Sequence, residues 1–191
     1  LLICNPPYVR HHHLSVDEKS RLLASVRQST GIQLNGLAGL YCYFMLLCHS
    51  WMADGGLAGW LIPSEFMDVN YGRQVKRYLL EQVTLLRIHR FRSEDVQFGD
   101  AMVSSVVVWF KKHLPAAGHV VEFSYGGSLN APVVTRRIPI DTLSASAKWT
   151  GIALSADTGE ATPVPGDLLE TTLGDLFQIK RGIATGANDF F

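Results

Sequence analysis

Nearly continuous apolar runs recur along the first two thirds of the chain, separated by longer amphipathic segments. Residues 1–4, 57–62 and 103–110 are mostly aliphatic or aromatic, which predicts buried strands, and the strand over 103–110 is expected to be buried on both faces. Residues 83–91 alternate apolar with basic positions and predict a fourth strand, and residues 119–125 predict a fifth at the periphery. The strands of one sheet are therefore expected within the first 125 residues.

The segments between these runs have the patterns of helices. Ser15 and Glu18 have the spacing of a capping box, which predicts a helix over 15–28. Residues 40–52 are apolar nearly all round, as in a helix packed inside a layered fold, and residues 71–81 are amphipathic. Strands that alternate with helices in this way predict an α/β fold, an open sheet with helices on both faces.

The amino-acid composition of the chain changes after residue 125. Small residues and proline dominate 126–166, which predicts a loop-rich connection, and ordered elements are expected again over 167–191. Apolar residues make up 47% and charged residues 18% of the sequence, a globular composition rather than a disordered one. The formal net charge is zero, so any contact with nucleic acid must come from a local basic patch.

Several classes of protein are disfavoured by the remaining patterns. Three cysteines lack CxxC spacing and lie in apolar runs, which favours buried reduced thiols. The longest apolar run, 40–52, is too short to cross a bilayer, so no membrane partner is expected. Adjacent side chains such as His11, His12 and His13 cannot all face one ion, so a polar loop near a substrate is favoured over a metal site.

The candidate chemistry lies in Asn5, Pro6, Pro7 and Tyr8, directly after the first strand. Open α/β sheets bind ligands at the carboxyl ends of their strands. An exocyclic amine of a nucleobase is a poor nucleophile because its lone pair is delocalised into the ring. Two fixed acceptors, the Asn5 amide oxygen and the Pro6 carbonyl, would localise that lone pair, and Tyr8 offers a face for stacking. By itself the motif fits an ordinary strand-ending turn equally well.

The motif and its surroundings resemble the amino methyltransferases that use S-adenosyl-L-methionine. In that family Asn-Pro-Pro-Tyr follows a hydrophobic strand and forms the catalytic motif. The start of the 40–52 segment resembles the helix that lines the adenosine of the methyl donor, which implies cofactor contacts for Leu40 and Phe44. Phe98 resembles the aromatic residue that touches the flipped base.

Residues 173–188 look like the entry to a target-recognition domain, with Lys180 and Arg181 as the implied DNA contacts. The order of these motifs is that of gamma-class DNA adenine-N6 methyltransferases from restriction–modification systems. The resemblance implies the later strands of a Rossmann-like methyltransferase sheet in 1–125, a connection over 126–166 and the start of target recognition in 167–191. It also implies double-stranded DNA as substrate, a flipped adenine, no metal, and the cytoplasm of a bacterium or archaeon.

One departure from the family concerns the methyl donor. The glycine-rich donor loop and the acidic residue that holds the ribose precede the catalytic motif in the family and have no counterpart here. We therefore expect this chain alone to be inactive, and to self-associate through an exposed hydrophobic strand edge. Methylation of RNA adenine or of a protein glutamine amide remains an alternative, as does a non-catalytic nucleic-acid-binding module.

Two weaker signals stay open. Six basic residues between positions 73 and 92 form either a phosphate-contacting stripe or a solvated helix face. Glu65 and Asp68 follow a predicted strand end, so they border a cleft or are ordinary surface acids. The six basic residues are Arg73, Lys76, Arg77, Arg87, Arg90 and Arg92.

Overall fold

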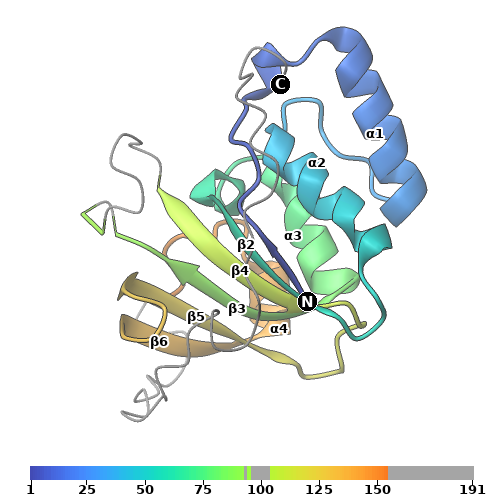
Figure 1. Ribbon diagram of the computed structural model, residues 1–191. Coiled ribbons are helices and arrows are strands. Elements are labelled where there is room, and N and C mark those ends of the chain that lie inside the picture. Colours follow the sequence, from blue (N-terminus) through green and yellow to red (C-terminus); the bar gives the residue numbers. More distant parts are fainter. Residues whose placement is uncertain (93, 96–103, 155–191) are drawn as a thin grey trace, which may run out of the picture.

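The computed structural model describes residues 1–92, 94–95 and 104–154. Those residues form an open six-stranded sheet with helices packed against it, which confirms the predicted α/β class (Figure 1). The strands are β1 (Leu2–Cys4), β2 (Leu57–Pro63), β3 (Thr84–Arg90), β4 (Ser105–Lys111), β5 (Val120–Gly127) and β6 (Pro132–Pro139). The α-helices are α1 (Val16–Thr30), α2 (Leu40–Leu47), α3 (Gly72–Glu81) and α4 (Ile140–Ala145), and 3₁₀ turns span His11–His13, Cys48–Trp51 and Ser64–Met67.

The strand directions bring four strand ends to one edge. The order is β1-β2-β4-β3-β5-β6, and β4 runs antiparallel to both of its neighbours. Because β1 is parallel to β2 and β3 is parallel to β5, the strands β1, β2, β3 and β5 all point the same way. Their carboxyl ends therefore lie along one edge of the sheet, where open α/β folds bind their ligands.

The core lies on one face of the sheet. Trp60, Val108 and Ile88 are fully buried on neighbouring strands, and they share a face in the sheet register. Tyr78 of α3 packs edge-on against Phe110 of β4, with ring centroids 5.8 Å apart. Each such fully buried large apolar side chain stabilises the fold by roughly 1.5–3 kcal/mol. The apolar runs seen in the sequence are thus the core-facing parts of these strands.

Within the described residues the helices lie on this one face. Trp149, which follows α4, packs against Phe123 of β5, and Ala147 accepts a hydrogen bond from Lys76 of α3, so α3 and α4 cover the same side. This differs from the expected arrangement with helices on both faces. The second face instead carries side chains such as Ile3 and Leu57, which are 50% and 43% exposed.

The helix ends follow the capping chemistry expected from the sequence. Ser15 and Glu18 form a complete capping box at the start of α1, with the Glu18 amide donating to the Ser15 hydroxyl at 3.2 Å. Gly31 ends α1 with a positive φ of 69°, a conformation that suits glycine. The predicted helix over 40–52 is shorter than expected, because α2 ends at Leu47 and a 3₁₀ turn follows it.

The region after residue 125 corrects two expectations. The strand β5 is not peripheral, since it pairs with β3 on one side and β6 on the other. The edge strand β6 and the helix α4 lie within 126–166, where a loop-rich connection was expected. Pro132 and Pro139 bound β6, and an edge strand tolerates proline because one of its sides needs no hydrogen-bonded partner. The domain division itself remains a prediction, because residues 155–191 lie outside the described part.

In the part of the chain that the structure describes, no helix has the length and apolar character needed to cross a membrane. The cysteine thiols are free, with Cys42 and Cys48 buried and Cys4 partly buried, as the sequence predicted.

Candidate active site

The Asn-Pro-Pro-Tyr motif begins where β1 ends, at the shared carboxyl edge of the sheet. Pro6 is buried and fixes the turn, whereas Asn5 and Pro7 are exposed. The Asn5 amide is therefore accessible to a ligand at the strand end. Tyr8 is half-buried and turns toward the neighbouring strand.

Two hydrogen bonds fix the loop that carries Tyr8. The Tyr8 hydroxyl donates to the Leu61 carbonyl of β2 at 3.1 Å. Burial raises the pKa of Tyr8 to about 12, so the phenol stays neutral at physiological pH. One residue further, the Val9 carbonyl accepts from the Leu40 amide at 2.9 Å. The motif is thus held between β2 and the first residue of α2.

The start of α2 contains both residues predicted to bind the cofactor. Leu40 is tied to the motif loop through its amide. Phe44 lies one turn further along α2 and is 38% exposed, although the helix is otherwise buried or half-buried. An exposed aromatic ring on an apolar helix offers a flat surface for a planar ligand. The structure thus brings Leu40 next to the motif and leaves Phe44 accessible.

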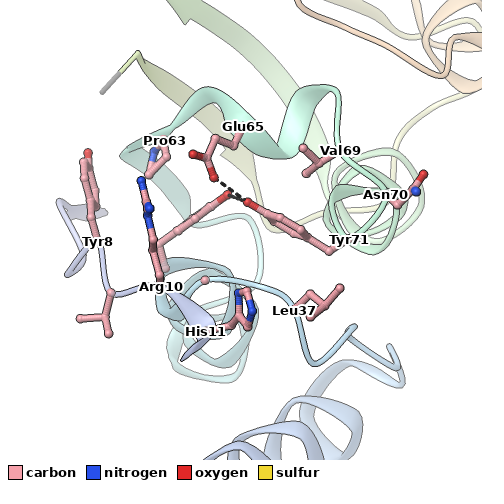
Figure 2. A pocket seen from close by; sticks show the side chains of 12 residues that line it. Tyr8, Arg10, His11, Leu37, Pro63, Glu65, Val69, Asn70 and Tyr71 are labelled. Carbon is pink, nitrogen blue, oxygen red and sulfur yellow. Dashed lines mark hydrogen bonds between the residues drawn. The ribbon is translucent and has the colours of Figure 1, made fainter. Parts of the chain in front are cut away.

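A cavity of about 520 Å³ opens beside Tyr8 (Figure 2). Its size falls within the usual range for small-ligand sites, about 300–1,000 Å³. Three tyrosines, an arginine, a histidine and a glutamate give it aromatic walls and polar groups of both charges. The lining residues are Tyr8, Val9, Arg10, His11, Leu37, Gly39, Tyr41, Pro63, Glu65, Val69, Asn70 and Tyr71.

One wall of the cavity contains a chain of hydrogen bonds. The Tyr71 hydroxyl donates to Glu65 Oε2 at 2.9 Å, and the Tyr41 hydroxyl lies 3.4 Å from the Tyr71 hydroxyl (Figure 2). Burial raises the pKa values of Tyr41 and Tyr71, so both phenols are neutral and act as donors. Glu65 is exposed and follows the end of β2. Its carboxylate is thus oriented by Tyr71 and offers an acceptor to the cavity.

Arg10 and His11 supply the basic groups of the cavity. His11 to His13 form a 3₁₀ turn that begins three residues after the motif, and the first of them lines the cavity. Among the described residues, no cluster of three His, Cys, Asp or Glu side chains has the geometry to hold a metal ion.

The remaining predicted site residues separate into two groups. Phe98, Lys180 and Arg181 lie outside the described residues, so their roles stay predictions. Asp68 does not border the cavity, since its carboxylate accepts from the backbone amides of Trp149 and Thr150, each at 3.2 Å, and fixes the turn after α4.

Sequence reasoning missed Arg10 and Tyr71 as site residues. Arg10 lies two residues after the motif, so its nearness to Tyr8 was a usable signal. Tyr71 has no such signal, because it reaches the cavity only through the packing of the segment between β2 and α3.

Comparisons with known proteins point to one family. The model described as Eco57I restriction-modification methylase matches residues 1–97. The chain is 32% identical over 187 residues to the Type II methyltransferase M.XamI of Xanthomonas campestris pv. amaranthicola, covering 97% of the chain and 34% of that protein. It is 34% identical over 107 residues to the Type II methyltransferase M.AccI of Acinetobacter calcoaceticus, covering 56% of the chain and 19% of that protein. The chain thus spans about a third or less of these relatives.

Solved structures share the fold. The type IIG restriction endonuclease BpuSI aligns with a TM-score of 0.57 and 16% identity over 75% of the chain and 19% of its own. A type I restriction-modification methyltransferase subunit from Streptococcus thermophilus aligns with a TM-score of 0.50 and 19% identity, over 64% and 25% respectively. These matches confirm the predicted Rossmann-like methyltransferase sheet. With residues 1–97 matched by the family model, the chain belongs to the Eco57I restriction-modification methylase family.

Proposed function

We propose that this chain carries the catalytic motif of a site-specific DNA adenine-N6 methyltransferase of a restriction–modification system, with S-adenosyl-L-methionine as the methyl donor. The observation that supports it most is the position of Asn5 and Tyr8. Both follow β1 at the carboxyl edge of the sheet, and Tyr8 forms a wall of the cavity. Asn5 is not among the cavity-lining residues, but it lies in the same four-residue motif as Tyr8, and an amide acceptor together with an aromatic face suits a planar, conjugated amine.

Asn5 and Pro6 would activate the amine by accepting hydrogen bonds from its two N–H groups. Asn5 is exposed, and Pro6 follows it in the same turn. Acceptors fixed before the reaction need no reorganisation, and each is worth roughly 3–4 kcal/mol by analogy with oxyanion-hole donors. The lone pair on the amine then points away from the ring plane. The proton leaves the amine after the methyl group has been transferred.

Tyr8 would hold the target base outside the duplex. An adenine amino group is paired inside double-stranded DNA, so the base must be flipped out before it can react. Stacking on an aromatic side chain is worth about 1–3 kcal/mol per base and offsets part of the cost of unstacking. The hydrogen bond from Tyr8 to Leu61 holds the ring in place before a base arrives.

Leu40 and Phe44 fit the adenosine part of the donor. Phe44 presents an exposed aromatic ring on an apolar helix, and the Leu40 amide ties that helix to the motif loop. When bound, S-adenosyl-L-methionine would supply the methyl group from its positively charged sulfur. The task of α2 is to orient that ligand and to exclude water from it.

DNA is favoured over RNA or a protein amide as acceptor by the relatives of the chain. M.XamI and M.AccI are both named Type II methyltransferases, and the family is one of restriction-modification methylases. The accessible Asn5 and the tethered Tyr8 favour an enzyme over a binding module that only keeps the fold.

The test is transfer of a labelled methyl group from S-adenosyl-L-methionine to unmethylated DNA by the full-length protein. Asn5→Ala should reduce the rate at least a hundredfold, because it removes one fixed acceptor. Asn130→Ala is the matched control, since Asn130 is an exposed asparagine in the turn between β5 and β6. Equal rates for Asn5→Ala and the wild type would reject the assigned role of the motif.

A further inference from the structure

The basic residues between positions 73 and 92 do not form one surface. Lys76 is only 6% exposed, and its ammonium donates to the carbonyls of Met67 and Ala147 at 3.0 and 2.6 Å. Arg77 pairs with Glu81 on the surface of α3 at 2.8 Å. Lys76 thus joins α3 to the turn after α4, and the charge of Arg77 is already paired.

Arg87 is occupied as well, on the second face of the sheet. Its guanidinium pairs with Glu122 at 2.8 Å and donates to the Ser124 hydroxyl at 3.1 and 3.2 Å. Arg73, in the first turn of α3, lines a separate pocket with Leu143 and Trp149. Arg90 and Arg92 lie together at the end of β3.

Arg90 and Arg92 both lie against the ring of Tyr125. Arg90 ends β3 and pairs in register with Tyr125 of the parallel strand β5. The guanidinium carbons of Arg90 and Arg92 are 5.7 and 5.8 Å from the centre of that ring. Such cation–π contacts are favourable and restrict the orientation of both guanidinium groups. Two cations are thereby held side by side on one aromatic residue.

Both guanidinium groups have hydrogen-bonding capacity left. Within the described residues, neither forms an ion pair with a carboxylate. Arg90 Nε is buried and has no hydrogen-bond partner there, and Arg90 Nη1 reaches the Thr150 carbonyl only at 3.4 Å. A buried donor without a partner is unfavourable, and an oxygen-rich anion bound to this arginine would offset that cost.

The backbone around the pair is fixed by the nearest acid. Asp95 Oδ2 accepts from the amides of Arg92 and Gly127, both at 3.0 Å, so this oxygen joins the end of β3 to the end of β5. Gly126 has a positive φ of 68°, and a Cβ there would lie 2.5 Å from Arg92 Nε. The missing side chain at Gly126 therefore gives the Arg92 side chain its space.

A third arginine adds to the positive charge on this face. Arg136 of β6 pairs in register with Phe123, and its Nε donates to the Ala153 carbonyl at 3.0 Å.

We propose that Arg90 and Arg92, held on Tyr125, bind a backbone phosphate of the DNA strand that carries the target adenine. A guanidinium binds phosphate oxygens through parallel N–H groups, and within the described residues neither of these guanidinium groups is paired with a carboxylate. This proposal rests on the proposed function, and it adds a contact that anchors the same DNA strand a few nucleotides from the flipped one.

The spacing along the edge fits that role. Asn5 follows β1 and Arg90 ends β3, and the sheet order separates these strands by three steps. Strands lie about 4.8 Å apart, so the two ends are about 14 Å apart. Successive phosphates of one DNA strand advance about 3.4 Å along the helix axis, so the bound phosphate would lie about four nucleotides from the target.

The test is the salt dependence of DNA binding by the full-length protein. We would compare the wild type with Arg90→Gln, Arg92→Gln and the double variant. Arg77→Gln is the matched control, because it removes an arginine that is exposed and paired away from the edge. The slope of log K against log salt should become shallower by about 0.9 if the double variant loses one phosphate contact, and Arg77→Gln should keep the wild-type slope. Thermal unfolding would verify that each variant is folded.

The outcomes separate this inference from the proposed function. A wild-type slope in the folded double variant, with normal methylation, would overturn the phosphate contact and leave the proposed function intact. A loss of affinity that is equal at every salt concentration would also overturn it, because the arginines would then act only through packing. A wild-type protein that neither binds nor methylates DNA would overturn both.

Discussion

The Tyr8 hydroxyl donates a hydrogen bond to the Leu61 carbonyl across the gap between the motif loop and β2, at 3.1 Å. Leu61 continues its own strand pairing with Val107, so the tyrosine is anchored to the interior of the sheet. The ring that is expected to receive the target base is therefore tied to the backbone of β2.

Two substitutions of Tyr8 distinguish its hydrogen bond to Leu61 from its expected stacking on the target base. Tyr8→Phe keeps the ring and loses the hydrogen bond, so we expect a loss of about 1 kcal/mol in unfolding free energy and a small change in rate. Tyr8→Ala also removes the stacking face, so binding of a flipped base should weaken by about 1–3 kcal/mol. Fluorescence of 2-aminopurine at the target position would measure this. Equal fluorescence in all three proteins would argue against stacking on Tyr8.

The Tyr71–Glu65 contact should matter for catalysis more than for stability. Tyr71→Phe releases the Glu65 carboxylate, and we expect kcat/KM to fall about tenfold, since one hydrogen bond to a charged group is worth about 1.5 kcal/mol or more. Tyr41→Phe is the matched control, because its hydroxyl lies 3.4 Å from Tyr71 and does not contact Glu65. If Tyr41→Phe and Tyr71→Phe had the same small effect, the oriented carboxylate would have no role.

A close contact on the second face of the sheet predicts a stability change. A Cβ on Gly59 would lie 2.5 Å from the ring of Trp109 on the adjacent strand. Gly59→Ala should lower the unfolding free energy by about 1–3 kcal/mol through overpacking. Urea denaturation would measure it, with Gly36→Ala as the control, because a Cβ at Gly36 meets nothing within 4 Å. Unchanged stability in Gly59→Ala would show that Trp109 moves aside freely.

His89 predicts how stability depends on pH. It is fully buried, and burial lowers its pKa to about 4, with the nearby charge of Arg87 adding to the effect. The unfolded chain, with a histidine pKa near 6.5, binds the proton more readily than the folded chain. The contribution of neutral His89 to the unfolding free energy is therefore fully present above about pH 6.5. It falls by about 2–3 kcal/mol as the pH drops toward 4.

Urea denaturation at pH 7 and pH 5 would measure that loss, and His89→Gln should reduce it. The pKa of His49 is also lowered, chiefly by burial, so its contribution should persist in His89→Gln. An identical pH dependence in His89→Gln and the wild type would contradict the assignment to His89.

The strands and the motif were accessible to sequence reasoning because their signals are local. Trp60 and Val108 lie in apolar runs, and Asn5 follows such a run directly. The strand β6 was missed because Thr135, Arg136 and Arg137 interrupt its apolar pattern. An edge strand tolerates such polar residues because it has a partner strand on one side only.

Contacts between distant segments account for what the sequence did not reveal. Tyr71 reaches Glu65 through the fold of the turn after β2, and Arg92 reaches Tyr125 through the parallel pairing of β3 with β5. No local pattern records either contact. The six basic residues between positions 73 and 92 likewise differ in burial and pairing, and these differences depend on the sheet and helix packing rather than on the local sequence.

The product of the reaction tests the central claim most directly. The full-length protein would be incubated with unmethylated DNA and S-adenosyl-L-methionine, and the DNA digested to nucleosides for mass spectrometry. We predict N6-methyladenine as the methylated nucleoside, and its loss with Asn5→Ala. A methylated cytosine, or N6-methyladenine formed equally by Asn5→Ala, would contradict the account.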